Sequence, residues 1–210
     1  NEFRFFHRSW VPLLLQLLHH LTTPTAPFTF GTASASWQYE GAQDISKTGR
    51  GPSIWEDFCG SLDPCEKPRC PGGGRDIASV ADDQHNLTRL AADISRMRTL
   101  GTGAYRLSLS WSRILPTGRL EDGLNQQGVD HYRTVLRMLR DAGIEAWVTL
   151  FHFDLPSTLE REESGWLNAS IVARFSDYAR VCFASFGDLV VRWITINEAH
   201  TIATAGYLYD

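Results

Sequence analysis

The run Ile144-Glu145-Ala146-Trp147-Val148-Thr149-Leu150-Phe151 says most about how this chain folds. It is rich in β-branched, aromatic and other apolar residues, which follow one another almost without interruption instead of alternating with polar ones. Such a strand is buried on both faces, as in a parallel sheet that is covered by helices. The run therefore predicts an α/β fold.

Apolar residues recur at helical spacing on both sides of this strand, between further strand-like runs. We expect helices over residues 85–100, 128–142 and 171–186, and strands over residues 28–34, 104–111 and 190–196. This alternation predicts repeated βα units, right-handed crossovers and a parallel sheet. The pattern alone leaves two architectures open, a doubly wound open sheet and part of a barrel.

The composition is that of a globular domain without a nucleic-acid-binding surface. The 210 residues are 43% hydrophobic and carry a formal net charge of −4, which allows a large core and provides no basic stripe. We expect small or neutral partners, and the oligomeric state is left open. Gly72-Gly73-Gly74 lies in a long loop rather than directly after a strand, so we expect no nucleotide cofactor.

Three of the four cysteines lie close together. Cys59, Cys65 and Cys70 fall in one Pro/Gly-rich stretch, whereas Cys182 lies in a helical pattern that would bury it as a free thiol. A metal site is the weaker interpretation of the cluster, because no histidine stands at ligand spacing. We therefore expect one loop disulfide and no metal.

Residues 1–27 are treated separately from the rest of the chain. Basic residues precede an apolar run over residues 10–18 that is too short to span a bilayer but suits a signal peptide. The alternative is an N-terminal extension. Asn86 and Asn168 begin N-glycosylation sequons. These features favour secretion over the alternative, a cytoplasmic location, and membrane anchoring is not visible.

Polar side chains follow three of the expected strands. They are Gln38 and Glu40, His152 and Asp154, and Asn197 and Glu198. In parallel α/β folds the carboxyl ends of the strands meet on one face. Residues far apart in the sequence are therefore expected to form one site there.

Each of these residues also has an ordinary structural interpretation. Glu198 could act as a general acid, or it could cap the helix that follows. His152 could bind a ligand, although an isolated histidine in an apolar strand is more often a buried structural residue. Arg106 lies inside a strand and needs a carboxylate or several hydrogen bonds, and no partner is evident from the sequence.

Five runs of the chain resemble, in order, the signatures of family 1 glycoside hydrolases, the group of β-glucosidases, lactase-phlorizin hydrolase, myrosinases and klotho proteins. The runs are Phe30–Ala42 (FGTASASWQYEGA), Gly51–Trp55 (GPSIW), Tyr105–Ile114 (YRLSLSWSRI), Phe151–Pro156 (FHFDLP) and Thr195–Glu198 (TINE).

The resemblance implies a (β/α)8 TIM barrel, of which this chain covers about the first four βα units, and a retaining β-glycosidase that needs no metal or cofactor. Glu198 would be the acid/base, and Asn197 would bind the sugar 2-hydroxyl. Gln38 and His152 would bind other hydroxyls of the substrate, a small-molecule β-glucoside or β-galactoside. Arg106 would orient the nucleophile, a glutamate that the family carries after its seventh strand.

The resemblance also implies that residues 28–210 are the N-terminal half of a barrel. Retaining hydrolysis needs two carboxyl groups, and Glu198 is only one of them. We therefore expect the isolated chain to be inactive and poorly folded. The alternative function is a klotho-like receptor or binding domain, which keeps the barrel and loses catalytic glutamates.

Five positions depart from the family pattern. Two are Gln84 and Asn86, which flank His85 where the family more often carries aromatic or basic residues. Ala199 replaces the usual proline after the acid/base, Phe153 replaces the usual tryptophan beside His152, and Ser164 stands where glycine usually precedes Gly165. These departures bear on the preferred sugar rather than on the class of reaction.

Overall fold

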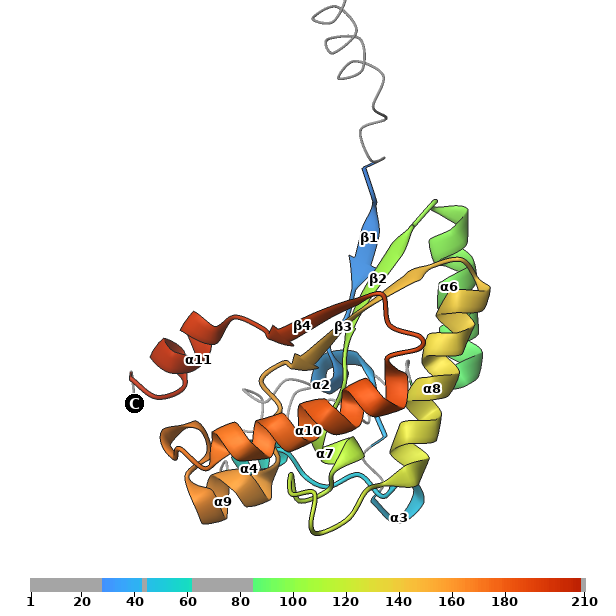
Figure 1. Ribbon diagram of the computed structural model, residues 1–210. Coiled ribbons are helices and arrows are strands. Elements are labelled where there is room, and N and C mark those ends of the chain that lie inside the picture. Colours follow the sequence, from blue (N-terminus) through green and yellow to red (C-terminus); the bar gives the residue numbers. More distant parts are fainter. Residues whose placement is uncertain (1–27, 43–44, 62–84, 209–210) are drawn as a thin grey trace, which may run out of the picture.

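A four-stranded parallel sheet forms the centre of the computed structural model, which describes residues 28–42, 45–61 and 85–208 (Figure 1). The strands lie in sequence order: β1 (Gly31–Ala33), β2 (Ala104–Ser108), β3 (Glu145–Phe151) and β4 (Arg192–Ile196). Neighbours pair in parallel, with Arg106 beside Trp147 and Phe151 beside Ile196. The predicted parallel α/β fold is confirmed.

The three long helices occur where the sequence predicts them. They are α6 (Leu87–Thr99), α8 (Gln126–Asp141) and α10 (Ile171–Phe186), and α8 packs against β3 and against both of the other helices (Figure 1). Asn86 begins α6 by accepting hydrogen bonds from the backbone of Thr88 and Arg89 at 3.1 and 3.2 Å. One sequon asparagine is therefore a helix cap.

Shorter helices occupy the segments that follow the strands, and the sequence analysis did not predict them. They are α2 (Ser36–Tyr39), α3 (Ile45–Thr48), α4 (Ile54–Ser61), α7 (Trp111–Ile114), α9 (Ser157–Glu163), the 3-10 helix η2 (Gly165–Leu167) and α11 (Ala199–Ala205). Several consist of a single turn or two, which is too short for helical periodicity to be recognised.

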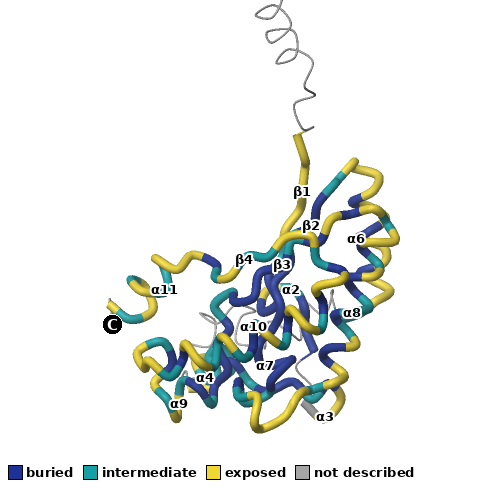
Figure 2. The backbone as a smooth tube through the Cα atoms, viewed as in Figure 1, coloured by how far each residue is buried: buried dark blue, intermediate teal, exposed yellow. Residues whose placement is uncertain are grey.

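The hydrophobic core lies between β2 and β3 and the long helices (Figure 2). Val148 and Leu150 of β3 are fully buried, as the continuous apolar run predicts. Trp111 stacks on Tyr178 with ring centroids 4.8 Å apart, and the Tyr178 hydroxyl donates a hydrogen bond to the Leu150 carbonyl at 2.9 Å. The core thus joins α7 and α10 to the central strand.

The expected strand over residues 104–111 is shorter in the structure. It ends at Ser108, and Trp111 begins α7 with its indole N–H bonded to the Gly118 carbonyl at 3.2 Å. Leu109 and Trp111 are buried in the turn as they would be in a strand. These two side chains would be buried in a strand or in a turn, and the prediction that the strand extends to Trp111 was wrong.

Several expectations fall partly on residues that the structure does not describe. Residues 1–27, Cys65 and Cys70 lie outside the described ranges, whereas Cys59 is disulfide-bonded and Cys182 is a buried free thiol. The expected disulfide is therefore confirmed for Cys59. Within the described ranges, no helix is both long enough and apolar enough to cross a membrane.

Gly51 provides a test of the packing between two of the motif segments. Its N–H donates to the Ser112 carbonyl at 2.8 Å, and a Cβ added there would lie 1.8 Å from the Pro116 oxygen. We expect Gly51→Ala to lower the free energy of unfolding by about 2 kcal/mol or more, because backbone would have to move. Urea denaturation of the full-length protein measures this.

Gly60 is the matched control, because no atom of the described residues lies within 4 Å of a Cβ added to this residue of α4. Gly60→Ala should leave stability unchanged or raise it slightly, since alanine favours helix. Equal stability losses for both variants would contradict the described packing.

Candidate active site

The carboxyl ends of β2, β3 and β4 bring together four of the residues singled out in the sequence. The Asn197 N–H donates to the Phe151 carbonyl at 2.9 Å, which places Asn197 beside the residue before His152. Arg106, on the neighbouring strand, donates from Nη2 to Asn197 Oδ1 at 2.6 Å. His152 is close enough to Arg106 and Glu198 for both charges to affect its pKa.

Arg106 has the hydrogen bonds that the sequence analysis required of it. Besides Asn197, it donates from Nε to Thr149 Oγ1 at 3.1 Å. Thr149 lies on β3 and Asn197 directly follows β4, so the guanidinium spans three strands. Both acceptors are neutral, and two of the five guanidinium donors are used by these bonds.

Two polar nitrogens of the site are buried without a hydrogen-bond partner in the part of the chain that the structure describes: Asn197 Nδ2 and His152 Nδ1. Because Arg106 binds Oδ1, the Asn197 amide turns its NH₂ group away from the guanidinium. A buried polar group left unpaired costs about 1–3 kcal/mol. Such atoms at a strand end are typical of a ligand-binding site.

His152 is held in its neutral form. Burial lowers its pKa from the ordinary value of 6.5, and the positive charge of Arg106 lowers it further, against the opposing effect of Glu198. A neutral imidazole has one donor and one acceptor nitrogen, which suits a hydroxyl group.

Glu198 has an unusual backbone conformation, with φ 44° and ψ 58° in the left-handed region. Phe153, which follows β3, has φ 66°. Non-glycine residues in this region are strained by about 1–2 kcal/mol and cluster at functional sites.

Glu198 stands at the N-cap position of α11, yet its side chain forms no capping hydrogen bond among the described residues. It is exposed and accepts from the Thr201 hydroxyl at 3.0 Å. The strain and this exposed carboxylate favour the catalytic interpretation over the helix cap.

Gln38 lies on α2, directly after β1, with an exposed side chain. Its helix is tied to the ends of β2 and β3: the Ser36 N–H donates to Ser108 Oγ at 2.7 Å, and the Ser36 hydroxyl donates to Asp154 at 2.6 Å. Gln38 is therefore near the carboxyl ends of the strands, as the other four residues are. As far as the chain is described, its side chain takes no part in the contacts that join the other four residues.

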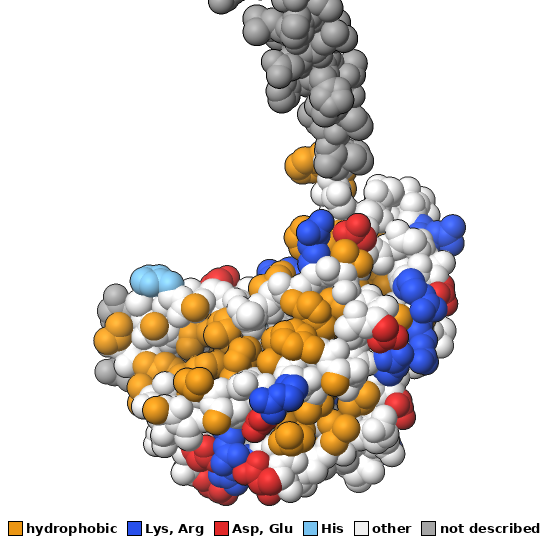
Figure 3. All heavy atoms as spheres, viewed as in Figure 1, with side chains coloured by type: hydrophobic (Ala, Val, Ile, Leu, Met, Phe, Trp, Pro, Cys, Tyr) orange, Lys and Arg blue, Asp and Glu red, His pale blue; other side chains and the backbone are white. Residues whose placement is uncertain are grey.

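An aromatic groove of about 460 Å³ begins beside Glu198. Its lining includes Trp55, Phe153, Trp166 and Thr201, and hydrophobic side chains gather on this face over β4 and α11 (Figure 3). The sequence analysis missed this groove. Much of its lining comes from α4, η2 and α11, which are short helices without a recognisable pattern, and the rest includes Phe151, Phe153 and Glu160.

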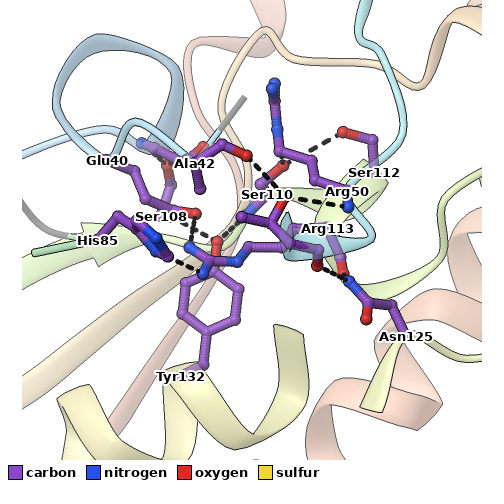
Figure 4. A network of polar contacts seen from close by, with 12 residues as sticks. Glu40, Ala42, Arg50, His85, Ser108, Ser110, Ser112, Arg113, Asn125 and Tyr132 are labelled. Atoms are coloured by element: carbon purple, nitrogen blue, oxygen red, sulfur yellow. Dashed lines mark hydrogen bonds and ion pairs between the residues drawn. The ribbon is translucent and has the colours of Figure 1, made fainter. Parts of the chain in front are cut away.

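Glu40 turns out to be structural. It forms a buried ion pair with Arg113 and accepts from the Tyr132 hydroxyl at 2.5 Å, while Arg113 contacts His85 Nδ1 at 2.9 Å (Figure 4). The expectation that Glu40 joins the site was wrong. The network instead anchors the segment after β1 to α7 and α8. In the described ranges no group of three or more His, Cys, Asp or Glu residues could hold a metal.

Comparison with known proteins identifies related sequences over nearly the whole chain. The model of glycosyl hydrolase family 1 matches residues 21–210. The rice protein β-glucosidase 34 is 45% identical over 184 residues, which cover 86% of this chain and 33% of the relative. Arabidopsis thaliana β-glucosidase 14 is 43% identical over 181 residues, which cover 86% and 35%. The chain thus spans about a third of the length of these curated relatives.

Solved structures show the same similarity. A rice β-glucosidase mutant in a covalent complex with Glc has a TM-score of 0.75 and 42% identity, covering 86% of this chain and 35% of that one. β-Glucosidase 2 from the fungus Trichoderma reesei, in complex with Tris, has a TM-score of 0.75 and 40% identity, covering 86% and 36%.

The charge of Arg106 can be tested through His152. We expect Arg106→Met to raise the pKa of His152 toward 6.5 without reaching it, because burial, the larger cause of the lowered value, remains. NMR titration of the full-length protein with labelled histidine measures this. Arg180→Met, which removes an exposed guanidinium of α10, is the control. An unchanged His152 pKa in Arg106→Met, or an equal change in the control, would refute the geometry.

Proposed function

Because the chain belongs to glycosyl hydrolase family 1, we propose that it supplies the proton-transfer group and much of the sugar-binding site of a retaining β-glucosidase. Its parallel βα units correspond to the first four of the family's (β/α)8 barrel. In this proposal residues 28–210 form the N-terminal half of the barrel, and a small-molecule β-glycoside is the substrate. The relatives described above carry β-glucosidase names, and none of these favours the receptor alternative.

One observation carries the proposal more than any other: Asn197 Nδ2, which has no hydrogen-bond partner among the described residues, belongs to the residue next to the strained, exposed Glu198. A donor beside a carboxylic acid suits a substrate that offers a hydroxyl near the bond to be broken. In this role Asn197 binds the 2-hydroxyl, and hydrogen bonds to that group strengthen in the transition state of glycoside hydrolysis.

Glu198 then acts twice in the reaction. It first gives a proton to the oxygen of the leaving group while a second carboxylate attacks the anomeric carbon, and it later takes a proton from the water that releases the sugar. The nucleophile belongs to a later strand of the barrel. The free donors of Arg106 are suited to orient its carboxylate. Gln38 and His152 bind other hydroxyls of the same sugar.

We also propose that residues 1–27 direct the protein into the secretory pathway. The disulfide of Cys59 supports this, because disulfides persist in oxidising compartments. Expression of the full-length protein in eukaryotic cells should yield secreted protein that lacks the first residues. Uncleaved protein that stays in the cytoplasm would contradict it.

Glu198→Gln tests the acid role. We expect kcat/KM for aryl β-glucosides with poor leaving groups to fall about 100-fold or more in the full-length protein, because these need a proton in the transition state. Substrates with strongly activated leaving groups should be affected far less. Steady-state kinetics over a series of leaving groups measures the difference.

Glu145→Gln is the control, because this exposed carboxylate lies at the opposite end of β3. It should leave kcat/KM unchanged across the series. Equal losses for good and poor leaving groups in Glu198→Gln would show that the residue is not the acid. The absence of β-glucosidase activity in the full-length protein would refute the proposed function itself.

A further inference from the structure

Three buried polar residues lie behind the candidate site and belong to three different segments. Ser36, Ser108 and Asp154 are at most 4% exposed. The Ser36 N–H donates to Ser108 Oγ at 2.7 Å, Ser108 Oγ lies 3.2 Å from Ser36 Oγ, and the Ser36 hydroxyl donates to Asp154 Oδ2 at 2.6 Å. The His152 N–H approaches Asp154 Oδ1 at 3.4 Å. These bonds connect the ends of the first three strands.

Each member of this group stands two residues from a residue of the proposed sugar site. Ser36 precedes Gln38, and Asp154 follows His152. Ser108 follows Arg106 on β2, and residues two apart in a strand lie on the same face of the sheet. The cluster is therefore close in sequence to Gln38 and His152, which are proposed to bind the sugar, and to Arg106 on β2.

Ser36 contacts both other members of this group, and Asp154 supplies its carboxyl group, whose burial needs an explanation. Within the described ranges Asp154 forms no ion pair. Its shortest hydrogen bond is the one that the Ser36 hydroxyl donates. Burial raises the pKa of Asp154 to about 7, and the bond from Ser36 is the largest effect that opposes the rise. A fully buried carboxyl group is costly to keep. Hydrophobic residues would fill the same volume at less cost, so its retention indicates a requirement for specific geometry.

We propose that Ser36, Ser108 and Asp154 form a positioning cluster that holds the segments bearing Gln38 and His152 in register for sugar binding, with Ser108 anchoring Ser36 to β2. The inference rests on the proposed function. The cluster touches neither Glu198 nor its helix in the described contacts. Its loss should therefore weaken sugar binding in the ground state and the transition state alike, which raises KM and leaves kcat nearly unchanged.

A double-mutant cycle tests the Ser36–Asp154 bond in the full-length protein. We expect Ser36→Ala and Asp154→Asn each to raise KM for an aryl β-glucoside roughly 10-fold, with kcat changed less than about 3-fold. If the bond is the cause, the double variant should be no worse than the worse single variant. Ser108→Ala should act in the same direction.

Ser34→Ala is the matched control. Ser34 directly follows β1, two residues before Ser36, but its hydroxyl pairs with the Tyr105 hydroxyl at 2.5 Å and takes no part in the described hydrogen bonds of the cluster. KM should not change. Additive losses in the cycle, an equal effect in Ser34→Ala, or a fall in kcat with constant KM would overturn the proposal.

A measurement that needs no activity separates this proposal from the proposed function. In Ser36→Ala the NMR signals of the His152 ring should shift, although the two residues are far apart in the sequence, and in Ser34→Ala they should not. If the His152 signals shift in Ser36→Ala and the full-length protein has no β-glucosidase activity, the cluster is supported and the proposed function is contradicted. Unchanged His152 signals in Ser36→Ala and Ser108→Ala, with thermal melting showing folded protein, would reject the cluster.

Discussion

The register of β2, β3 and β4 pairs Arg106 with Trp147 and Trp147 with Arg192. From this position the Arg106 side chain reaches Thr149 and Asn197, which lie further toward the carboxyl ends of the strands. Parallel pairing leaves little freedom here, because all strands end on the same side and a shift by one residue turns every side chain to the other face. The guanidinium of Arg106 then joins the three strands at this edge. The orientation of the Asn197 amide follows from that contact, and the positive charge of Arg106 adds to burial in lowering the pKa of the nearby His152.

The sequence predicted the long elements well, because each carries a strong periodic signal over many residues. The helix over residues 171–186 has the predicted bounds, and the others differ by only one or two residues at an end. The short helices after the strands gave no such signal. Trp111 shows the reason: every residue from Leu107 to Leu115 is buried, so burial does not mark where the strand ends and α7 begins, and only tertiary packing decides it.

The site was predictable as a location and less so as a set of contacts. Strand ends pointed to His152, Asn197 and Glu198, and the charge inside a strand pointed to Arg106. These four residues lie together. The same rule also pointed to Glu40, whose burial beside Arg113 and Tyr132 depends on α7 and α8 and cannot be inferred from nearby sequence. Departures from the family pattern also have local consequences. Ser164 adopts φ 58°, a conformation that costs glycine nothing, and Ala199 occupies the first position of α11, where proline is well tolerated.

The contact between Arg106 and Asn197 also determines that this part of the site presents hydrogen-bond donors to its ligand. With its oxygen bound by a guanidinium, the asparagine amide offers only hydrogen atoms, and so does the rest of the guanidinium beside it. A sugar that places an oxygen there meets a matching partner. An amino sugar would place a protonated ammonium against these donors and the positive charge of Arg106. On the proposed assignment, discrimination between glucosides and 2-amino-glucosides is built into a single side-chain orientation.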